Sequence, residues 1–363
     1  MISEKDFIFK NPDKRILDIG NVRVKSPSNI ALVKYWGKSE PQIPKNASIS
    51  FTLKNCFTIT TLEYSKKKNL SEMPDIKVIF EGEEKEEFKP KVEEFFERIT
   101  NYVPFISDYD FVIRTENSFP HSSGIASSAS GMSALAYCIM SLEKKLHSTV
   151  TQEYFSNKTS FLSRLGSGSA ARSIEGPVVV WGKHPKIGNS SDLYGTVFPF
   201  KIHPIFENFQ DTILLVDQGE KQISSTIGHN LMIDHPYAQN RFNQANQNLD
   251  ILTEVLQKGN IKEFIQIVES EALALHAMMM TSNPYFILMK PNTLKIIDKI
   301  WDFRKETNLN ICFTLDAGAN VHVLFPKDEK KEIETFITTE LISFCQNNKY
   351  ICDSLGEGAE MII

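Results

Sequence analysis

The sequence predicts an α+β protein, and three observations support this fold class. Runs typical of strands occur early in the chain, at 22–25, 30–33, 48–53 and 57–62. Segments with apolar residues at helical spacing follow from about residue 90. Strand-like segments then return among helices in the second half. With 363 residues, the chain is long enough for two domains or one large one.

The first elements are expected to be short strands. Pro27 has no backbone N–H and is predicted to break the strand between 22–25 and 30–33. Residues 48–53 alternate polar and apolar side chains, as a half-buried strand does. The region 65–85 is rich in Lys and Glu, and we interpret it as a solvated surface hairpin.

The later elements are mostly helices. They are expected near 90–101, 131–145, 151–164, 238–257, 260–280 and 293–306. Strands are expected at 177–181 and 211–216, and a strand, a turn and a strand at 310–325. The stretch 184–206 contains Gly188, Gly195 and several prolines, which makes it the best candidate for a linker.

Composition narrows the functional class. Hydrophobic residues make up 41% and charged residues 23%, as in globular proteins, and no apolar run reaches the roughly 18 residues of a membrane span. The polar start, MISEKD, lacks a signal-peptide core, and five cysteines show no C-x-x-C pair, so we expect a cytoplasmic protein with free thiols. A formal net charge of −5 argues against nucleic acid but not against a small anion.

A serine-rich loop at 120–131 (PHSSGIASSASG) leads directly into an apolar helix. Gly124 and Gly131 frame four serines, so the backbone can approach a ligand and present N–H groups at a helix N-terminus. Hydroxyl groups there can hold a phosphate or Mg²⁺. No lysine follows the second glycine, so this is not the G-x-x-x-x-G-K-[ST] loop. Ordinary capping of a serine-rich helix remains an alternative.

Two further segments could hold anionic groups. Residues 26–38 (SPSNIALVKYWGK) place Lys34 and Lys38 around two aromatic residues and a glycine, which forms a cationic corner or, alternatively, a solvated strand end. Residues 163–173 (SRLGSGSAARS) place Arg172 about one turn inside a Gly/Ser-rich helix start. An arginine there can clamp a carboxylate, or it can be an exposed side chain over a flexible turn.

Two polar residues lie at the ends of predicted strands, where either a turn or a functional site is expected. Asp316 ends an apolar strand and precedes Ala317-Gly318, a position typical of strand-end catalytic residues and also of an Asx-turn. Asn46 precedes the strand 48–53 and could either point into a site or close its turn. Taken singly, both segments fit the turn at least as well as a functional site.

Taken together and in this order, these segments resemble the diphosphomevalonate decarboxylase family, of the galactokinase, homoserine kinase, mevalonate kinase and phosphomevalonate kinase superfamily. The matching segments are NIALVKYWGK (29–38), NASISFTL (46–53), FPHSSGIASSASG (119–131), SRLGSGSAARS (163–173), SSTIGH (224–229), LHA (275–277) and TLDAGAN (314–320). The KYWGK and GSGSAxRS patterns are specific to the decarboxylases. The chain departs from the family pattern in PHSSG for PTAAG, in Ser130 and Ala171 for alanine and cysteine, and in DAGAN for DAGPN.

The resemblance implies a two-domain small-molecule kinase (GHMP-type) fold with the active site in the interdomain cleft. Residues 1–205 would form an N-terminal ATP-binding domain, and residues 206–363 a ferredoxin-like C-terminal domain. The implied reaction is ATP-dependent decarboxylation of mevalonate 5-diphosphate to isopentenyl diphosphate, with release of ADP, phosphate and CO₂, by a homodimer. The alternatives are an enzyme acting on mevalonate 5-phosphate, a mevalonate-type kinase without decarboxylation, and a non-catalytic binding protein.

The resemblance also implies a role for each matched residue. Asp316 would accept or orient the proton of the 3-hydroxyl group and then stabilise positive charge at C3. Lys34 would interact with Asp316 and with the transferred phosphoryl group. Arg172 would grip the C1 carboxylate of the substrate. Asn29 would orient Arg172 and that carboxylate.

The remaining implied contacts are with the substrate and the nucleotide. Substrate binding is expected from Tyr35, Lys38, Ser167 and Ser169 in addition to Arg172, with Tyr35 and Lys38 at the diphosphate. ATP binding is expected from Ser122, Gly124, Ala126, Ser127 and Ser128. Mg²⁺ would be held through the ATP phosphates and Ser127. Lysines of the region 85–91, such as Lys85 and Lys89, could supply further positive charge.

Overall fold

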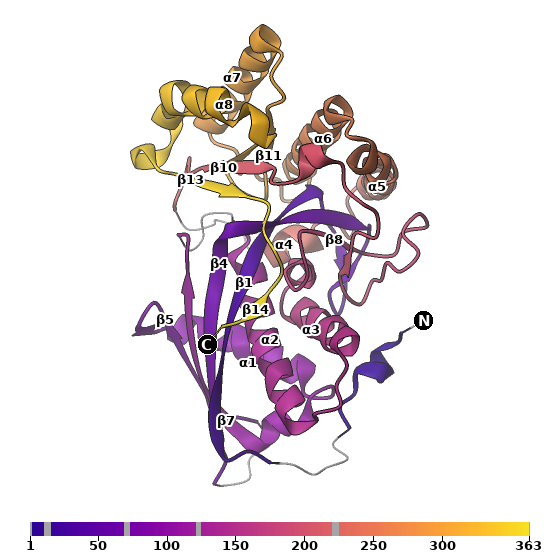
Figure 1. The fold of residues 1–363 in the computed structure, drawn as a ribbon, viewed down its shortest axis with the longest axis vertical. Helices are drawn as coiled ribbons and strands as arrows, with labels where there is room; N and C mark the ends of the chain where they lie inside the picture. The colour runs from indigo at the N-terminus through magenta and orange to yellow at the C-terminus, as the bar shows by residue number, and fades with distance from the viewer. Residues whose placement is uncertain (1, 11–15, 69–72, 121–124, 220–224, 363) are drawn as a thin grey trace.

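Two large β-sheets, one above the other, organise the protein (Figure 1). The computed structural model describes residues 2–10, 16–68, 73–120, 125–219 and 225–362. The larger sheet has eight strands, with β14-β1-β4-β7-β5-β6 side by side, β8 added to β4, and β9 added to β8. Their bounds are β1 Ile19–Val33, β4 Ser48–Lys66, β5 Ile76–Phe80, β6 Glu83–Glu84, β7 Tyr109–Asn117, β8 Val178–Trp181, β9 Thr196–Val197 and β14 Glu360–Met361. A small hairpin pairs β2 (Lys38–Ser39) with β3 (Ile43–Pro44).

Three helices cover one face of the larger sheet. They are α1 (Lys89–Ile99), α2 (Ser127–Leu146) and α3 (Gln152–Gly166). Small residues of α2 let the helix lie close to the strands: the hydroxyl groups of Ser133 and Ser26 are 2.6 Å apart, as are those of Ser130 and Thr58. The serine-rich run is therefore partly a packing surface, and α2 begins four residues before the helix expected from the sequence.

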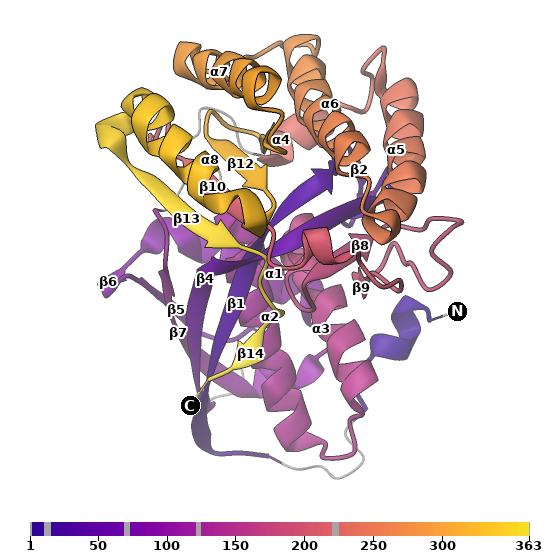
Figure 2. The ribbon, with the colours of Figure 1, turned by 45° about the horizontal axis from the view of Figure 1, so that its top comes forward.

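The second sheet belongs to the later part of the chain, with strand order β11-β12-β10-β13. The strands are β10 Gln210–Leu214, β11 Cys312–Thr314, β12 Val321–Phe325 and β13 Tyr350–Ser354. Figure 2 shows the helices α5 (Ala238–Lys258), α6 (Ile261–Met280), α7 (Pro291–Thr307) and α8 (Lys330–Phe336) gathered around this sheet. The helices expected at 238–257, 260–280 and 293–306 are thus confirmed.

Two long strands replace the four short ones expected from the sequence. β1 runs through Pro27, where a register shift against β4 between Pro27 and Asn29 accommodates the residue that lacks an N–H. β4 likewise continues through Lys54 and Asn55. From Ile30 to Val33, every residue of β1 is buried, because this end of the strand has protein on both faces.

Two other expectations are wrong. The region 65–85 is not only a solvated hairpin, since β5 pairs in parallel with β7 and buries Ile76, Val78 and Phe80. Lys77 takes the exposed position between Ile76 and Val78. The stretch 184–206 is not a bare linker: β9 pairs with β8, and Phe198 is buried there.

We call the larger sheet with its helices the larger half and the second sheet with its helices the other half. The chain passes between these two halves twice. It first passes from β9 to β10, and it later returns after β13 so that β14 can pair with β1, with Val24 opposite Met361 and Lys25 opposite Glu360. Close by, the carboxylate of Asp353 accepts hydrogen bonds from the N–H groups of Lys54, Asn55 and Cys56 at 2.8–2.9 Å. The domain boundary at residue 205 stays a prediction.

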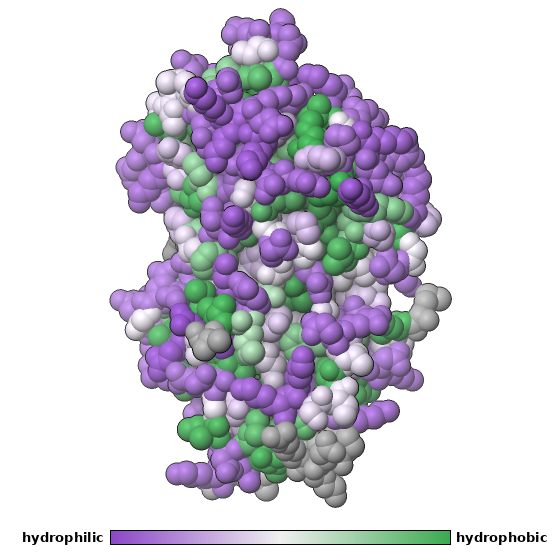
Figure 3. All heavy atoms as spheres, in the orientation of Figure 1, coloured by the Kyte–Doolittle hydropathy of each residue, from purple (hydrophilic) through white to green (hydrophobic). Residues whose placement is uncertain are grey.

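The surface and the cysteines agree with the composition. The face in Figure 3 is largely hydrophilic, with smaller hydrophobic areas between. No helix in the described ranges is long and apolar enough to cross a membrane. All five cysteines are free thiols, as expected.

A buried ion pair between α2 and α3 gives a stability prediction. Lys158 Nζ lies 2.6 Å from Glu143 Oε2, and both side chains are almost completely buried. We expect Lys158→Met to lower the free energy of unfolding by about 3–5 kcal/mol, because it leaves a buried carboxylate without its partner. The double variant Glu143→Leu/Lys158→Met should recover most of this loss. Denaturant titration of the three proteins measures both effects.

The loss in Lys158→Met should depend on pH. Burial raises the pKa of Glu143 from 4.5 to about 7, although Lys158 opposes the shift. A group whose pKa is raised in the folded state favours folding at low pH and loses that contribution as pH rises through the raised value. Lys158→Met removes the charge that opposes the shift, so the pKa of Glu143 should rise further in the variant. The destabilisation relative to the unmodified protein should therefore be larger at pH 8 than at pH 5. An equal loss at both values would contradict the assignment of the pair.

Candidate active site

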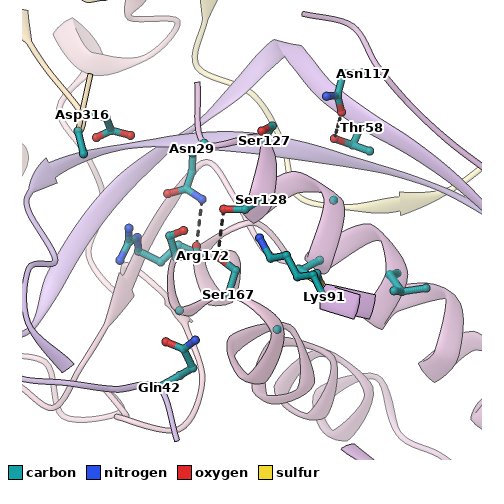
Figure 4. A pocket seen from close by; sticks show the side chains of 18 of the residues that line it. Asn29, Gln42, Thr58, Lys91, Asn117, Ser127, Ser128, Ser167, Arg172 and Asp316 are labelled. Atoms are coloured by element: carbon teal, nitrogen blue, oxygen red, sulfur yellow. Dashed lines mark hydrogen bonds between the residues drawn. The ribbon is translucent and has the colours of Figure 1, made fainter. Parts of the chain in front are cut away.

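A cavity of about 700 Å³ lies where the two halves meet. The end of β1, the first turn of α2 and the segment after α3 contribute from the larger half, and the loop after β11 contributes from the other (Figure 4). Asn29, Lys34, Arg172 and Asp316 all line this cavity, so the structure brings together the four residues expected to be catalytic.

Lys34 and Asp316 form an ion pair across the two halves. Lys34 Nζ lies 3.1 Å from Asp316 Oδ1, and the Lys34 side chain is buried whereas that of Asp316 is one-quarter exposed. Burial lowers the pKa of Lys34 below its usual value, and the charge and hydrogen bond of Asp316 oppose this shift. The carboxylate thus helps a buried lysine to keep its proton while remaining open to the cavity.

Residues other than the four expected to be catalytic hold this pair in place. The N–H of Lys34 donates to Glu271 Oε2 at 2.8 Å, and the carbonyl of Lys34 accepts from Asn46 Nδ2 at 3.0 Å. Glu271 is itself paired with Arg241, whose Nη1 lies 3.0 Å from Oε1. On the other partner, His276 Nε2 is 3.1 Å from the carbonyl oxygen of Asp316. Asn46 Nδ2 also donates to the carbonyl of Ala47 at 2.8 Å, so Asn46 closes its turn and supports the backbone of Lys34 without lining the cavity.

Arg172 is fixed on one side and faces the cavity on the other. It ends a short 3₁₀ helix (Gly168–Arg172), where its Nε donates to Ser50 Oγ at 2.5 Å and its Nη1 to Ser48 Oγ at 2.6 Å. The guanidinium carbon lies 5.7 Å from the ring centre of Trp181. Burial lowers the pKa of Arg172 to about 10, with the charge of Asp316 opposing, so the side chain stays cationic at neutral pH. The alternative of an exposed surface arginine is wrong.

Asn29 contacts the segment that carries Arg172 but does not bond to Arg172 itself. Its Nδ2 donates to the carbonyl of Ser169 at 3.1 Å and to Ser173 Oγ at 2.8 Å. The Oδ1 of Asn29 and the hydroxyl of Tyr35 are both buried without a hydrogen-bond partner among the described residues. Buried polar atoms of this kind are normally paired. Because both residues line the cavity, their missing partner fits a bound polar ligand.

The cationic corner is built around Tyr35 and Lys38. Tyr35 packs against Trp181, with ring centres 4.6 Å apart, and Lys38 Nζ lies 3.0 Å from Glu40 Oε1. Both residues line the cavity, as do Ser167 and Ser169. Lys38 is 6% exposed, so the alternative of a solvated strand end is wrong for this corner.

The first turn of α2 opens into the same cavity. Ser127 and Ser128 are its first two residues, and Ala126 before them adopts a left-handed conformation with φ 44°. Ser128 Oγ lies 3.3 Å from Ser167 Oγ, which joins this helix start to the segment after α3 (Figure 4). Free N–H groups, hydroxyls and the helix dipole suit phosphate groups. Ser122 and Gly124 lie outside the described residues.

Part of the cavity lining is apolar. Val78, Phe80 and Met132 line the cavity, together with Lys91 of α1. Lys85 and Lys89 are not among the lining residues, and Lys85 pairs with Glu83 on the surface. Of the lysines in the region 85–91, which was expected to supply positive charge, Lys91 is the one that lines the cavity. Apolar walls beside a helix start that suits phosphate groups fit a nucleoside triphosphate.

Family comparisons agree with this geometry. A diphosphomevalonate decarboxylase-like N-terminal domain matches residues 26–192, and a mevalonate 5-diphosphate decarboxylase C-terminal domain matches residues 212–358. The chain belongs to the diphosphomevalonate decarboxylase family. It is 26% identical to the diphosphomevalonate decarboxylase of Gibberella zeae, covering 86% of this chain and 82% of that protein. The enzyme of Ganoderma lucidum is 27% identical, with coverages of 86% and 80%.

Solved structures of this family share the fold. The mevalonate diphosphate decarboxylase from Staphylococcus aureus matches with a TM-score of 0.80 at 26% identity, covering 95% of this chain and 98% of that one. A complex of MDDEF with MVAPP, AMPPCP and magnesium matches with a TM-score of 0.80 at 25% identity, covering 95% and 99%. The expected two-domain GHMP-type fold is thereby confirmed.

Sequence reasoning missed several residues of the site. His229 and His276 fall within segments that carry the family resemblance, yet no role was expected for them. Ser48 and Ser50 lie in NASISFTL, where their alternation indicated only a strand. No sequence pattern marks Glu271, because its hydrogen bond with the N–H of Lys34 joins residues 237 positions apart.

Proposed function

We propose that this protein decarboxylates mevalonate 5-diphosphate with ATP, forming isopentenyl diphosphate, ADP, phosphate and CO₂. The observation that carries the proposal is the Lys34–Asp316 pair, at 3.1 Å, in one cavity with the buried Arg172. A kinase needs a group that orients a hydroxyl. A decarboxylase also needs a cation to hold a carboxylate and an anion beside the carbon that becomes positive.

The chemistry follows from the difficulty of expelling hydroxide from a 3-hydroxy acid. ATP supplies the phosphoryl group that turns the 3-hydroxyl into a good leaving group. Asp316 accepts or orients the hydroxyl proton, and Lys34 holds Asp316 and the transferred phosphoryl group. When the phosphate leaves, the C1–C2 bond breaks and its electrons form the double bond between C2 and C3. The carboxylate of Asp316 stabilises the positive charge that develops at C3.

The other residues position the two substrates. Arg172 holds the C1 carboxylate with the part of its guanidinium that Ser48 and Ser50 leave available. Asn29 supports the Arg172 segment through Ser169 and Ser173. Tyr35, Lys38, Ser167 and Ser169 face the substrate. Ala126, Ser127 and Ser128 would hold the ATP phosphates, and the hydroxyl group of Ser127 would help to hold the accompanying Mg²⁺. Ser122 and Gly124 complete this loop in the proposal.

Incubation with Mg-ATP and mevalonate 5-diphosphate labelled at C1 tests the proposal. Labelled CO₂ and ADP should appear in equal amounts. ADP without CO₂ would support the kinase alternative. The absence of both products would support a non-catalytic binding protein.

We further propose that the protein is a cytoplasmic homodimer. Sedimentation of the purified protein measures the number of subunits.

The diphosphate should be strongly preferred over the monophosphate. Lys38 and the hydroxyl of Tyr35 lie in the corner proposed for the anionic end of the substrate, and each lost charged hydrogen bond costs about 1.5–3 kcal/mol. We expect kcat/KM for mevalonate 5-diphosphate to exceed that for mevalonate 5-phosphate by at least about a hundredfold. Parallel assays at saturating Mg-ATP measure this ratio. Equal values would remove the diphosphate assignment and leave the decarboxylation chemistry in place.

A further inference from the structure

His229 closes the corner that contains Tyr35 and Trp36. It belongs to the short helix α4 (Ser225–Asn230), and its Nδ1 accepts a hydrogen bond from the N–H of Gly37 at 2.9 Å. Its ring centre lies 4.2 Å from that of Tyr35 and 4.7 Å from that of Trp36. These three contacts fix both the position and the orientation of the imidazole ring.

The same contacts fix the proton on the ring. Because Nδ1 is the acceptor for Gly37, the neutral imidazole carries its hydrogen on Nε2. Burial and the nearby charges of Lys38 and Arg172 lower the pKa of His229 to about 3, so the ring is neutral at physiological pH. In the described part of the chain, no group accepts a hydrogen bond from Nε2.

The surroundings of this donor suit an anion. His229 lines the cavity beside Tyr35, Lys38 and Arg172. Arg172 is already committed through Nε and Nη1 to two serines, whereas Lys38 lies on the side of the corner proposed for the diphosphate. A neutral N–H donor next to a lysine adds a directional hydrogen bond to a phosphate oxygen without adding more positive charge to a buried site.

We propose that His229 binds the 5-diphosphate group of the substrate through its Nε2–H and helps to select that group. The inference rests on the proposed function, since it assumes mevalonate 5-diphosphate as the ligand. It assigns to α4 a direct part in substrate recognition, in addition to covering the aromatic pair of the corner.

Two substitutions separate substrate binding from a purely structural role. His229→Asn can keep an acceptor near the position of Nδ1 for Gly37 but has no donor near the position of Nε2. His229→Gln can place an amide donor near Nε2 but loses the acceptor for Gly37. His203→Asn is the matched control, because His203 Nδ1 also accepts a backbone N–H, from Ile205 at 3.2 Å, and lies away from the cavity.

Calorimetric titration with mevalonate 5-diphosphate, together with the melting temperature, provides the test. We expect His229→Asn to weaken binding by at least about tenfold with little change in melting temperature, and His229→Gln to restore most of the affinity. Wild-type affinity in His229→Asn would overturn the inference. So would a parallel loss of affinity and melting temperature in both variants. If the unmodified protein fails to bind mevalonate 5-diphosphate, the proposed function itself fails, which is a different outcome.

Discussion

Asp316→Asn is expected to lower kcat by at least about a thousandfold while mevalonate 5-diphosphate still binds. The amide is nearly the same size as the carboxylate, and its oxygen can still accept a hydrogen bond from Lys34 Nζ, which lies 3.1 Å from Asp316 Oδ1. It can neither accept a proton nor neutralise a cation forming at C3, and such general-base and electrostatic contributions are each worth about a hundredfold or more. Steady-state kinetics with titration of the substrate measure both quantities.

The substitution should also change Lys34. The charge of Asp316 opposes the lowering of the Lys34 pKa by burial, so that pKa should fall further in the variant. Asp298→Asn is the control, because Asp298 is an exposed residue of α7. A kcat within about tenfold of the unmodified enzyme would remove Asp316 from the mechanism. A loss of substrate binding in Asp316→Asn would mean that the residue acts in binding.

Arg172→Gln is expected to lower kcat/KM by about a thousandfold or more. Arginine can bind a carboxylate with two parallel hydrogen bonds, whereas glutamine offers one neutral amide on a shorter side chain. Without the clamp, the C1–C2 bond is no longer held for cleavage, and positioning effects of this kind contribute several kcal/mol. Because about 1.4 kcal/mol corresponds to tenfold in rate, a thousandfold loss is about 4 kcal/mol.

A structural effect must be separated from the loss of the clamp. Arg172 also donates one hydrogen bond each to Ser48 and Ser50. Its replacement therefore removes a donor from each of these two buried hydroxyl groups. Ser48→Ala removes one of these hydroxyl groups and keeps the guanidinium, and it should reduce kcat/KM far less than Arg172→Gln. Arg23→Gln, in an exposed ion pair with Glu116, controls for the change of residue type. Normal turnover of Arg172→Gln would show that the carboxylate binds elsewhere.

The sequence predicted the type of most elements but not the length of the longest strands. Pro27 and the Lys54-Asn55 pair interrupt the apolar pattern, so the pattern predicts separate short strands on either side of each. In the structure, a register shift accommodates Pro27, and Asp353 accepts the N–H groups of Lys54 and Asn55 from 299 and 298 positions away. Contacts over that distance leave no pattern in the local sequence.

The charged residues of the candidate site were predicted better than the residues that hold them in position. Family segments named the charged residues, and the structure places Lys34, Arg172 and Asp316 in one cavity. The residues that orient them are not visible from spacing, because Ser48 and Ser50 look like any alternating strand. In the sequence, Glu271 looks like an ordinary surface glutamate of a helix. In the structure it is fully buried, in contact with Arg241 and the backbone N–H of Lys34.

The return of β14 to β1 also determines the order in which the protein can reach its final structure during synthesis. The ribosome makes β1 and β4 about 300 residues before Asp353, which accepts three backbone N–H groups of β4. Until the later segment emerges, Val24 and Lys25 lie on an open strand edge, and open edges invite pairing with other chains. This part of the β1 edge, which β14 covers in the complete fold, is therefore open to mispairing during synthesis.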